Sequence, residues 1–146
     1  MKTILVTGGN GYLGSIIIKK LLKSGYKVLN LDNMIFNNKP LRYKKNKLLN
    51  FVGVSEDKYL LGEIFKYKIY GVIHLSGISN DPTAILNTEL TRKSNINGTK
   101  LLVEISKKNN VKKFLFASSC SVYGFTGESK FVDEKSALNP ISEYAK

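Results

Sequence analysis

Closely spaced glycines near the start of the chain could bind phosphate groups. They follow an apolar run at residues 4–6 and precede another, at helical spacing, from residue 16. Glycines let the backbone turn sharply and approach a pyrophosphate, and the free N–H groups of a following helix attract its charge. The segment fits G-x-G-x-x-G from Gly9 and G-x-x-G-x-x-G from Gly8. The candidate cofactor contacts are Gly8, Gly11, Tyr12, Leu13 and Gly14.

An acidic residue, Asp32, closes the next apolar run, at residues 28–31. In dinucleotide-binding units such an acid, about 20 residues beyond the glycines, accepts the hydroxyls of the adenosine ribose. A 2′-phosphate would meet its like charge, so the pattern predicts NAD rather than NADP as the cofactor. The alternatives are a glycine-rich turn without a ligand and a loop acid that merely ends a strand.

The elements that must position these residues alternate between strand and helix periodicity. Predicted strands are residues 2–7, 27–31, 48–52, 71–76 and 113–118, and predicted helices are residues 15–23, 57–66 and 83–108. On the long last helix, the residues expected to face the core are Leu86, Leu90, Leu101, Leu102 and Ile105. Right-handed crossovers then give an α/β Rossmann-type, doubly wound parallel sheet in the order 3-2-1-4-5. Its cofactor crevice is expected at the carboxyl ends of the strands.

The composition is that of one globular domain of 146 residues with 42% hydrophobic residues. No apolar stretch is long enough for a membrane span, and the first residues already belong to a strand, so we expect a cytoplasmic protein without a signal peptide or membrane contact. Cys120 is the single cysteine and His74 the single histidine. We therefore expect no internal disulfide and no metal site, with Cys120 as a small packing residue and His74 in a structural role.

The net charge of +12 raises the question of nucleic acid. The positive residues are almost all lysines spread over predicted helix ends and loops, as on a solvated surface. The densest run, residues 42–47, lies between two predicted strands and is interpreted as a polar loop, with a phosphate or nucleic-acid contact as the alternative. The charge pattern therefore predicts no nucleic-acid partner.

Four segments resemble, in the right order, signatures of the extended short-chain dehydrogenase/reductase family. They are residues 7–14, Asn-Ile-Asn-Gly-Thr at 95–99, Ser-Ser-Cys-Ser-Val-Tyr-Gly at 118–124, and Tyr144. The pattern is most similar to nucleotide-sugar epimerases, dehydratases and ketoreductases. The resemblance implies a second, sugar-binding domain, so residues 1–146 are expected to be an incomplete NAD(P)-binding domain that ends inside the catalytic helix. The whole protein is expected to be a homodimer that acts on a nucleotide sugar.

Oxidising a sugar hydroxyl needs a base, because the hydroxyl proton must leave together with the hydride. The resemblance assigns this role to Tyr144, and it assigns to Ser119 a hydrogen bond to the substrate oxygen. A phenol ionises at about pH 10 unless a cation lies nearby, and the family uses a lysine one helical turn after the tyrosine. That position lies beyond Lys146, so we expect the chain alone to show no turnover.

The resemblance also assigns residues around the cofactor. Asn33 would help to hold the adenosine ribose, the residues after the fourth strand, Leu75, Ser76 and Gly77, would line the nicotinamide ribose, and Asn95 would support the active-site backbone.

Residues 53–57 depart from the family pattern. Where many relatives carry an aspartate that contacts adenine, this chain has Val54. Base recognition must then rest on backbone groups or on another side chain, and Ser55 is counted among the cofactor-binding candidates.

The resemblance narrows the reaction. Relatives that eliminate water carry an acidic pair directly after the position of Ser119, where this chain has Cys120 and Ser121, so a 4,6-dehydratase is not expected. The first hypothesis is an NAD-dependent epimerase that acts by transient oxidation of a sugar hydroxyl. A nucleotide-sugar 4-ketoreductase and a non-catalytic dinucleotide-binding module are the alternatives.

Overall fold

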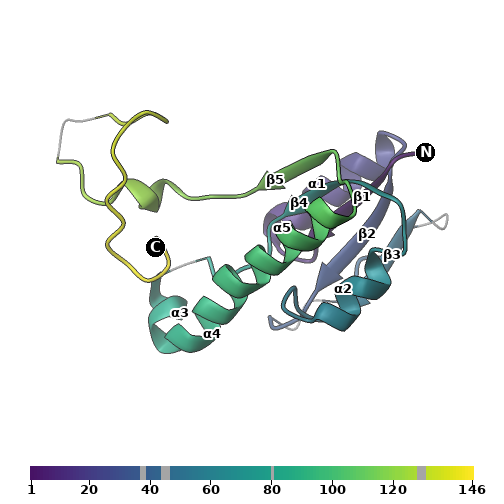
Figure 1. Ribbon diagram of the computed structural model, residues 1–146, viewed down its shortest axis with the longest axis horizontal. Helices are drawn as coiled ribbons and strands as arrows, with labels where there is room; N and C mark the ends of the chain where they lie inside the picture. Colours follow the sequence, from purple (N-terminus) through teal and green to yellow (C-terminus); the bar gives the residue numbers. More distant parts are fainter. Residues whose placement is uncertain (37–38, 44–46, 80, 128–130) are drawn as a thin grey trace.

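The strands form one parallel sheet at the centre of the molecule. The computed structural model describes residues 1–36, 39–43, 47–79, 81–127 and 131–146 (Figure 1). The sheet has the order β3-β2-β1-β4-β5, which confirms the predicted topology. Its strands are β1 Thr3–Thr7, β2 Lys27–Asp32, β3 Leu48–Val52, β4 Ile69–His74 and β5 Lys113–Phe116. Because the strands are parallel, their carboxyl ends meet at one edge, as the site prediction requires.

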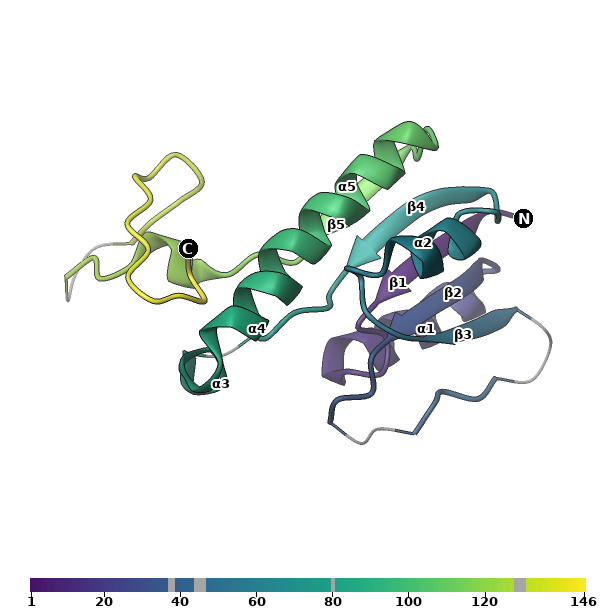
Figure 2. The same ribbon diagram turned by 60° about the horizontal axis from the view of Figure 1, so that its bottom comes forward.

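Helices cover both faces of the sheet, which makes the core two-sided (Figure 2). Helix α1, Tyr12–Lys23, buries Ile18 and Leu22 against one face of β1 and β2. On the other face, Leu61 of α2, Lys58–Ile64, and Leu102 of α5, Thr99–Lys108, are fully buried. The central strands carry apolar residues on both faces, as expected of a parallel sheet.

The predicted helix over residues 83–108 is interrupted at Asn87, and the part after the interruption is continuous but includes a π-helical segment. The structure has α3 at Asp81–Leu86, α4 at Thr88–Arg92, a π-helical segment η1 at Lys93–Gly98, and then α5. Asn87 breaks the helix with φ −151°, and its side-chain oxygen accepts the N–H of Leu90 at 2.9 Å. Local capping by asparagine thus outcompetes the apolar period.

The residues that were predicted to face the core from that helix are buried or packed against the core in its second half but exposed near the break at Asn87. Leu102 is fully buried, and Leu101 and Ile105 pack against the core, as predicted. Leu86 is 85% exposed and Leu90 39% exposed, so these two predictions are wrong.

The chain after β5 runs away from the sheet and returns toward α4 (Figure 1). It contains a 3₁₀ turn, η2 at Cys120–Tyr123, and the N–H of Asn139 donates to the carbonyl of Val122 at 2.9 Å. Tyr144 lies in a single turn in which the N–H of Lys146 donates to the carbonyl of Ser142 at 3.2 Å. The expected catalytic helix is therefore represented here by one turn.

Within the described ranges, no helix is long and apolar enough to cross a membrane. Of the basic run interpreted as a polar loop, residues 44–46 lie outside the described residues.

Candidate functional site

A cleft of about 520 Å³ runs along the carboxyl edge of the sheet. The residues that follow every strand contribute to its wall, and Tyr144 joins them from the C-terminal segment. The predicted cofactor residues that line it are Gly8, Gly11, Tyr12, Leu13, Gly14, Asp32, Asn33, Ser55, Leu75, Ser76 and Gly77. Parallel strand order thus gathers side chains from distant parts of the sequence in one place.

The glycine loop is pressed between two neighbouring strand ends. Gly8 has φ +69°, and its N–H donates to the carbonyl of Leu31 at 2.8 Å. A Cβ at Gly8 would lie 2.8 Å from the backbone nitrogen of Ser76, so any side chain would displace the loop after β4. Only glycine satisfies both the dihedral angle and the close approach.

The beginning of α1 is open to an anion. No side chain caps the helix at Gly11, and its first turn holds no acidic residue. The first N–H groups of a helix lack partners within it and point outward, so these groups form a cradle of positive potential at the cleft. This cradle fits a pyrophosphate.

Of the two glycine patterns, the one that begins at Gly8 lines the cleft. Gly9 packs instead against β2, where an added Cβ would lie 1.9 Å from Oδ1 of Asn30.

The carboxylate of Asp32 is held by the two loops beside it. Oδ2 accepts the N–H of Asn10 and Oδ1 accepts the N–H of Met34, each at 2.9 Å. A carboxylate has about four acceptor positions, so acceptor capacity remains for ribose hydroxyls. Next to it, Oδ1 of Asn33 accepts the N–H of Ile35 at 3.1 Å.

A row of asparagine side chains, not predicted from the sequence, supports the glycine loop from behind. Nδ2 of Asn30 donates to Oδ1 of Asn10 at 2.8 Å and to Oδ1 of Asn50 at 2.9 Å. Nδ2 of Asn50 then donates to the carbonyl of Leu41 at 2.9 Å. The available signal was Asn30 itself, a polar residue inside an apolar strand.

The single histidine, His74, belongs to a buried network under the loop after β4. It is fully buried, and its Nδ1 lies 2.6 Å from Oγ1 of Thr7, while its Nε2 lies 2.8 Å from Oγ1 of Thr99. Oγ1 of Thr7 also accepts two hydrogen bonds from Ser76, one from its hydroxyl at 2.9 Å and one from its backbone N–H at 3.3 Å. The network therefore ties β1 and α5 to Ser76, which lines the cleft, while His74 itself does not.

The free energy of unfolding is expected to fall as the pH drops through the range in which His74 is protonated in the unfolded chain but neutral in the folded chain. Burial lowers the pKa of His74 from 6.5 to about 4. Between these values the unfolded chain takes up a proton that the folded chain excludes, so acid favours unfolding by about 3 kcal/mol over the whole window. Urea unfolding measured between about pH 7 and pH 4 tests this, with His74→Gln as the comparison.

We expect His74→Gln to be less stable than the unmutated chain at neutral pH. Its free energy of unfolding should fall less on acidification, since the chain has no other histidine. Equal losses in both proteins would contradict the assignment.

A second cleft, of about 220 Å³, adjoins the first and shares Ser76, Gly77, Ser118 and Tyr144 with it. Both predicted catalytic residues, Ser119 and Tyr144, line this second cleft. Ser119 caps η2, because its Oγ accepts the N–H of Ser121 at 3.1 Å, and the same atom lies 3.1 Å from the Ser121 hydroxyl. The Ser119 hydroxyl must turn from Ser121 in order to donate to a substrate.

Asn95 holds the backbone between the two clefts. Its Oδ1 accepts the N–H of Ile78 at 2.8 Å, and its Nδ2 donates to the carbonyl of Ile78 at 2.9 Å. Asn95 lines the second cleft rather than the first, so its contact with the cofactor region passes through the loop after β4.

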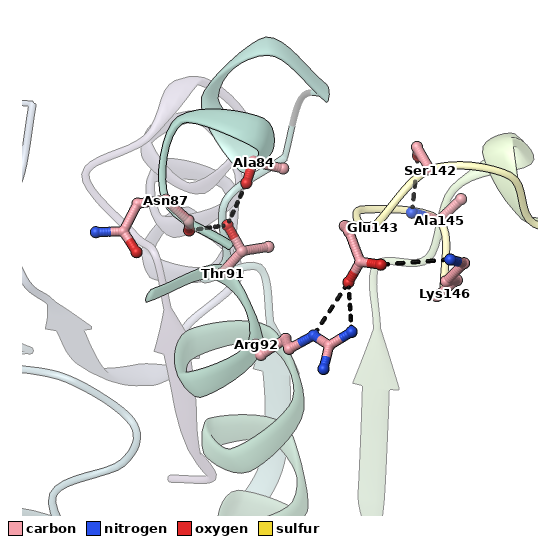
Figure 3. A network of polar contacts seen from close by, with 8 residues as sticks. All are labelled: Ala84, Asn87, Thr91, Arg92, Ser142, Glu143, Ala145 and Lys146. Carbon is pink, nitrogen blue, oxygen red and sulfur yellow. Dashed lines mark hydrogen bonds and ion pairs between the residues drawn. The ribbon is translucent and has the colours of Figure 1, made fainter. Parts of the chain in front are cut away.

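An ion pair joins the turn that carries Tyr144 to α4 (Figure 3). Nε and Nη2 of Arg92 donate to Oε2 of Glu143 at 3.0 and 2.9 Å, and Nζ of Lys146 lies 3.3 Å from Oε1. A hydrogen bond from Arg92 and, with a smaller effect, one from Lys146 hold the pKa of Glu143 below its usual value. Thr91 ties α4 to α3 through the carbonyl of Ala84, so the turn is anchored to a supported helix.

The chain matches a family model described as "NAD dependent epimerase/dehydratase family" over residues 4–146. It is 30% identical to a UDP-glucose 4-epimerase of Yersinia pestis, covering 98% of this chain and 44% of that protein. The solved UDP-glucose 4-epimerase of Thermotoga maritima with UDP-glucose is 32% identical with a TM-score of 0.88, covering 98% of this chain and 46% of the other.

A Thermus thermophilus UDP-glucose 4-epimerase solved with NAD gives 29% identity and a TM-score of 0.88, again over 98% and 46% of the two chains. This chain therefore spans less than half the length of these relatives.

Proposed function

The chain belongs to the NAD dependent epimerase/dehydratase family, and on this basis we propose that it forms the cofactor-binding part of a nucleotide-sugar epimerase. Its similarity to UDP-glucose 4-epimerases makes a UDP-sugar the first substrate to test. The observation that carries the proposal is the junction of two clefts at Tyr144, one with a phosphate cradle and one with Ser119.

The cofactor we propose is NAD, which supplies a reversible hydride acceptor when bound. The N–H groups at the start of α1 would hold its pyrophosphate, and Asp32 would accept the hydroxyls of its adenosine ribose. Ser76 and Gly77 lie on the other side of the glycine loop, where both clefts meet, and would line the nicotinamide end.

Tyr144 is the proposed base and Ser119 the proposed hydrogen-bond donor. Tyr144 would take the proton of the sugar hydroxyl, and Ser119 would stabilise the charge that develops on the same oxygen. The Arg92–Glu143 pair would keep the Tyr144 turn against α4 during this proton transfer. In an epimerase, the same two residues serve both the oxidation and the return, because the proton moves back to the same oxygen.

The experiment uses the whole protein that contains this chain, supplied with UDP-glucose and catalytic NAD. An epimerase interconverts UDP-glucose and UDP-galactose without net production of NADH. A 4-ketoreductase would instead consume reduced cofactor in proportion to a keto-sugar substrate. Cofactor binding without either reaction would leave the non-catalytic module as the function and overturn our proposal.

A further inference from the structure

We propose that the amino edge of the sheet, at the opposite end of the strands from the larger cleft, binds the phosphate backbone of double-stranded nucleic acid without a preference for sequence. The proposal goes beyond the cofactor and sugar chemistry and does not depend on it. It concerns the lysines at the starts of the strands, which we call the lysine row. In the order of strands β3, β2, β1, β4 and β5 they are Lys47, Lys27, Lys2, Lys68 and Lys112.

Parallel strand order gathers the lysine row at one edge of the fold. Lys27 is the first residue of β2, and each of the others directly precedes the first residue of its strand. The N–H of Lys27 donates to the carbonyl of Lys2 at 3.0 Å, and the N–H of Val28 donates to the carbonyl of Lys47 at 2.7 Å, so neighbouring strand starts are joined. This edge lies on the side marked N in Figure 2, away from the C-terminal segment. Lysines that are scattered along the sequence therefore form one surface, which is the reason to revise the expectation of no nucleic-acid partner.

Helix ends add further lysines beside the lysine row. Lys23 ends α1, Lys66 follows α2, and Lys107 and Lys108 end α5, and all four are exposed. Cations at the C-terminus of a helix offset the helix dipole, which accounts for these four without a ligand. Strands have only a small net dipole, so the same reason does not account for the lysine row.

Carboxylates do not neutralise this edge in the part of the chain that the structure describes. The turns at residues 24–26, 65–68 and 109–112 contain no acidic residue. Of the ion pairs between described residues, one lies here, and it joins Lys66 to Glu63 in the last turn of α2. The lysine row itself therefore keeps its positive charge.

Two ammonium groups of the lysine row lie over aromatic rings. Nζ of Lys2 is 4.2 Å from the centre of the Tyr70 ring, and Nζ of Lys27 is 5.1 Å from the centre of the Tyr67 ring. An aromatic face attracts the ammonium charge without accepting a conventional hydrogen bond from it. The N–H donors of these groups therefore remain available to phosphate oxygens.

The length of the lysine row matches the spacing of phosphates on a duplex. Neighbouring strands lie about 4.8 Å apart, so the row spans about 19 Å. Over that length one strand of a duplex presents about five or six phosphates, one every ~3.4 Å along the axis. Contacts to phosphates carry no sequence information, so we expect binding that is independent of sequence.

The same edge fits a bilayer or a single strand less well. Because the sheet twists by about 20–25° per strand, the five strand starts do not lie in one plane, and a flat lipid surface would contact only part of the row. Proteins that bind single strands stack bases on open aromatic faces. Here Tyr67 and Tyr70 lie beneath lysine ammonium groups.

The test is fluorescence anisotropy of a labelled DNA duplex of about 20 base pairs, titrated at several salt concentrations with the whole protein that contains this chain. We expect a Kd below about 10 μM at about 50 mM salt, and a slope of log K against log[salt] of about −4 to −5, near −0.9 for each phosphate neutralised. Two duplexes of different sequence should bind within about threefold of each other.

The row variant replaces Lys2, Lys68 and Lys112, the exposed lysines before β1, β4 and β5, by glutamine. It should bind the duplex at least about tenfold more weakly, and its salt slope should be less steep by about three. Its affinity for NAD should stay unchanged, because the larger cleft lies at the other end of the strands. If the triple variant does not fold, Lys68→Gln alone should reduce the slope by about one.

The matched control removes the same charge elsewhere, by glutamine at Lys58, Lys93 and Lys135. These lysines are also exposed, and they lie at the first residue of α2, at the first residue of η1 and in the C-terminal segment. Duplex affinity of this control should stay within about twofold of the unmutated value, which separates the lysine row from the net charge of +12.

Three outcomes would overturn the inference and leave the proposed function intact. They are equal weakening by the row variant and the control, tighter binding of a single strand than of the duplex, and no duplex binding at about 50 mM salt. Binding of vesicles that contain phosphatidylserine, without binding of the duplex, would assign the lysine row to a lipid surface instead.

Discussion

Replacement of Tyr144 by phenylalanine in the whole protein is expected to lower turnover of the nucleotide sugar by at least about 100-fold. The phenol oxygen is the proposed acceptor of the sugar hydroxyl proton, and phenylalanine keeps the ring that lines both clefts while removing that oxygen. Affinity for NAD should therefore stay within about twofold of the unmutated value. Steady-state kinetics together with calorimetric titration measure the two quantities.

Tyr123→Phe is the matched control, because Tyr123 is also partly buried and lines neither cleft. It should leave turnover unchanged. Ser119→Ala should lower turnover by about 10- to 100-fold, since a single hydrogen-bond donor to developing charge is removed. Normal turnover in Tyr144→Phe would show that another group accepts the proton.

The second large effect is expected at Gly14. A Cβ there would lie 2.3 Å from the carbonyl oxygen of Gly8 and 2.5 Å from Cα of Gly9. Gly14→Ala must push the loop away from α1 and spoil the phosphate cradle. We expect at least about 100-fold weaker NAD binding and a loss of about 1–3 kcal/mol in the free energy of unfolding.

Gly62→Ala provides the control for this substitution. Gly62 lies inside α2, and an added Cβ would meet nothing within 4 Å. Alanine is the better helix former, so this variant should gain about 0.5–1 kcal/mol of stability without a change in binding. NAD binding by Gly14→Ala at unmutated affinity would contradict the proposed position of the pyrophosphate.

The sequence predicted the cleft well because its residues follow from strand order. Glycines after one strand and Asp32 after the next must meet when the strands are parallel and adjacent. The predicted contacts followed the glycine pattern from Gly8, but the reason why Gly9 does not line the cleft could not be predicted, since the Asn30 side chain lies against Gly9 only in the folded chain.

Other features depend on contacts that spacing does not reveal. The break at Asn87 was missed because the apolar period continues through it, whereas the capping hydrogen bond decides the local structure. The Arg92–Glu143 pair joins residues 51 positions apart, and no local pattern connects them.

The most direct test of the account is calorimetric titration of the chain with NAD and NADP. Our central claim is that a dinucleotide lies in the larger cleft with its adenosine ribose on Asp32. A 2′-phosphate would meet that carboxylate, so NAD should bind at least about tenfold more tightly than NADP, and Asp32→Ala should weaken NAD binding and reduce this preference. Equal affinity of the unmutated chain for NAD and NADP would contradict the claim.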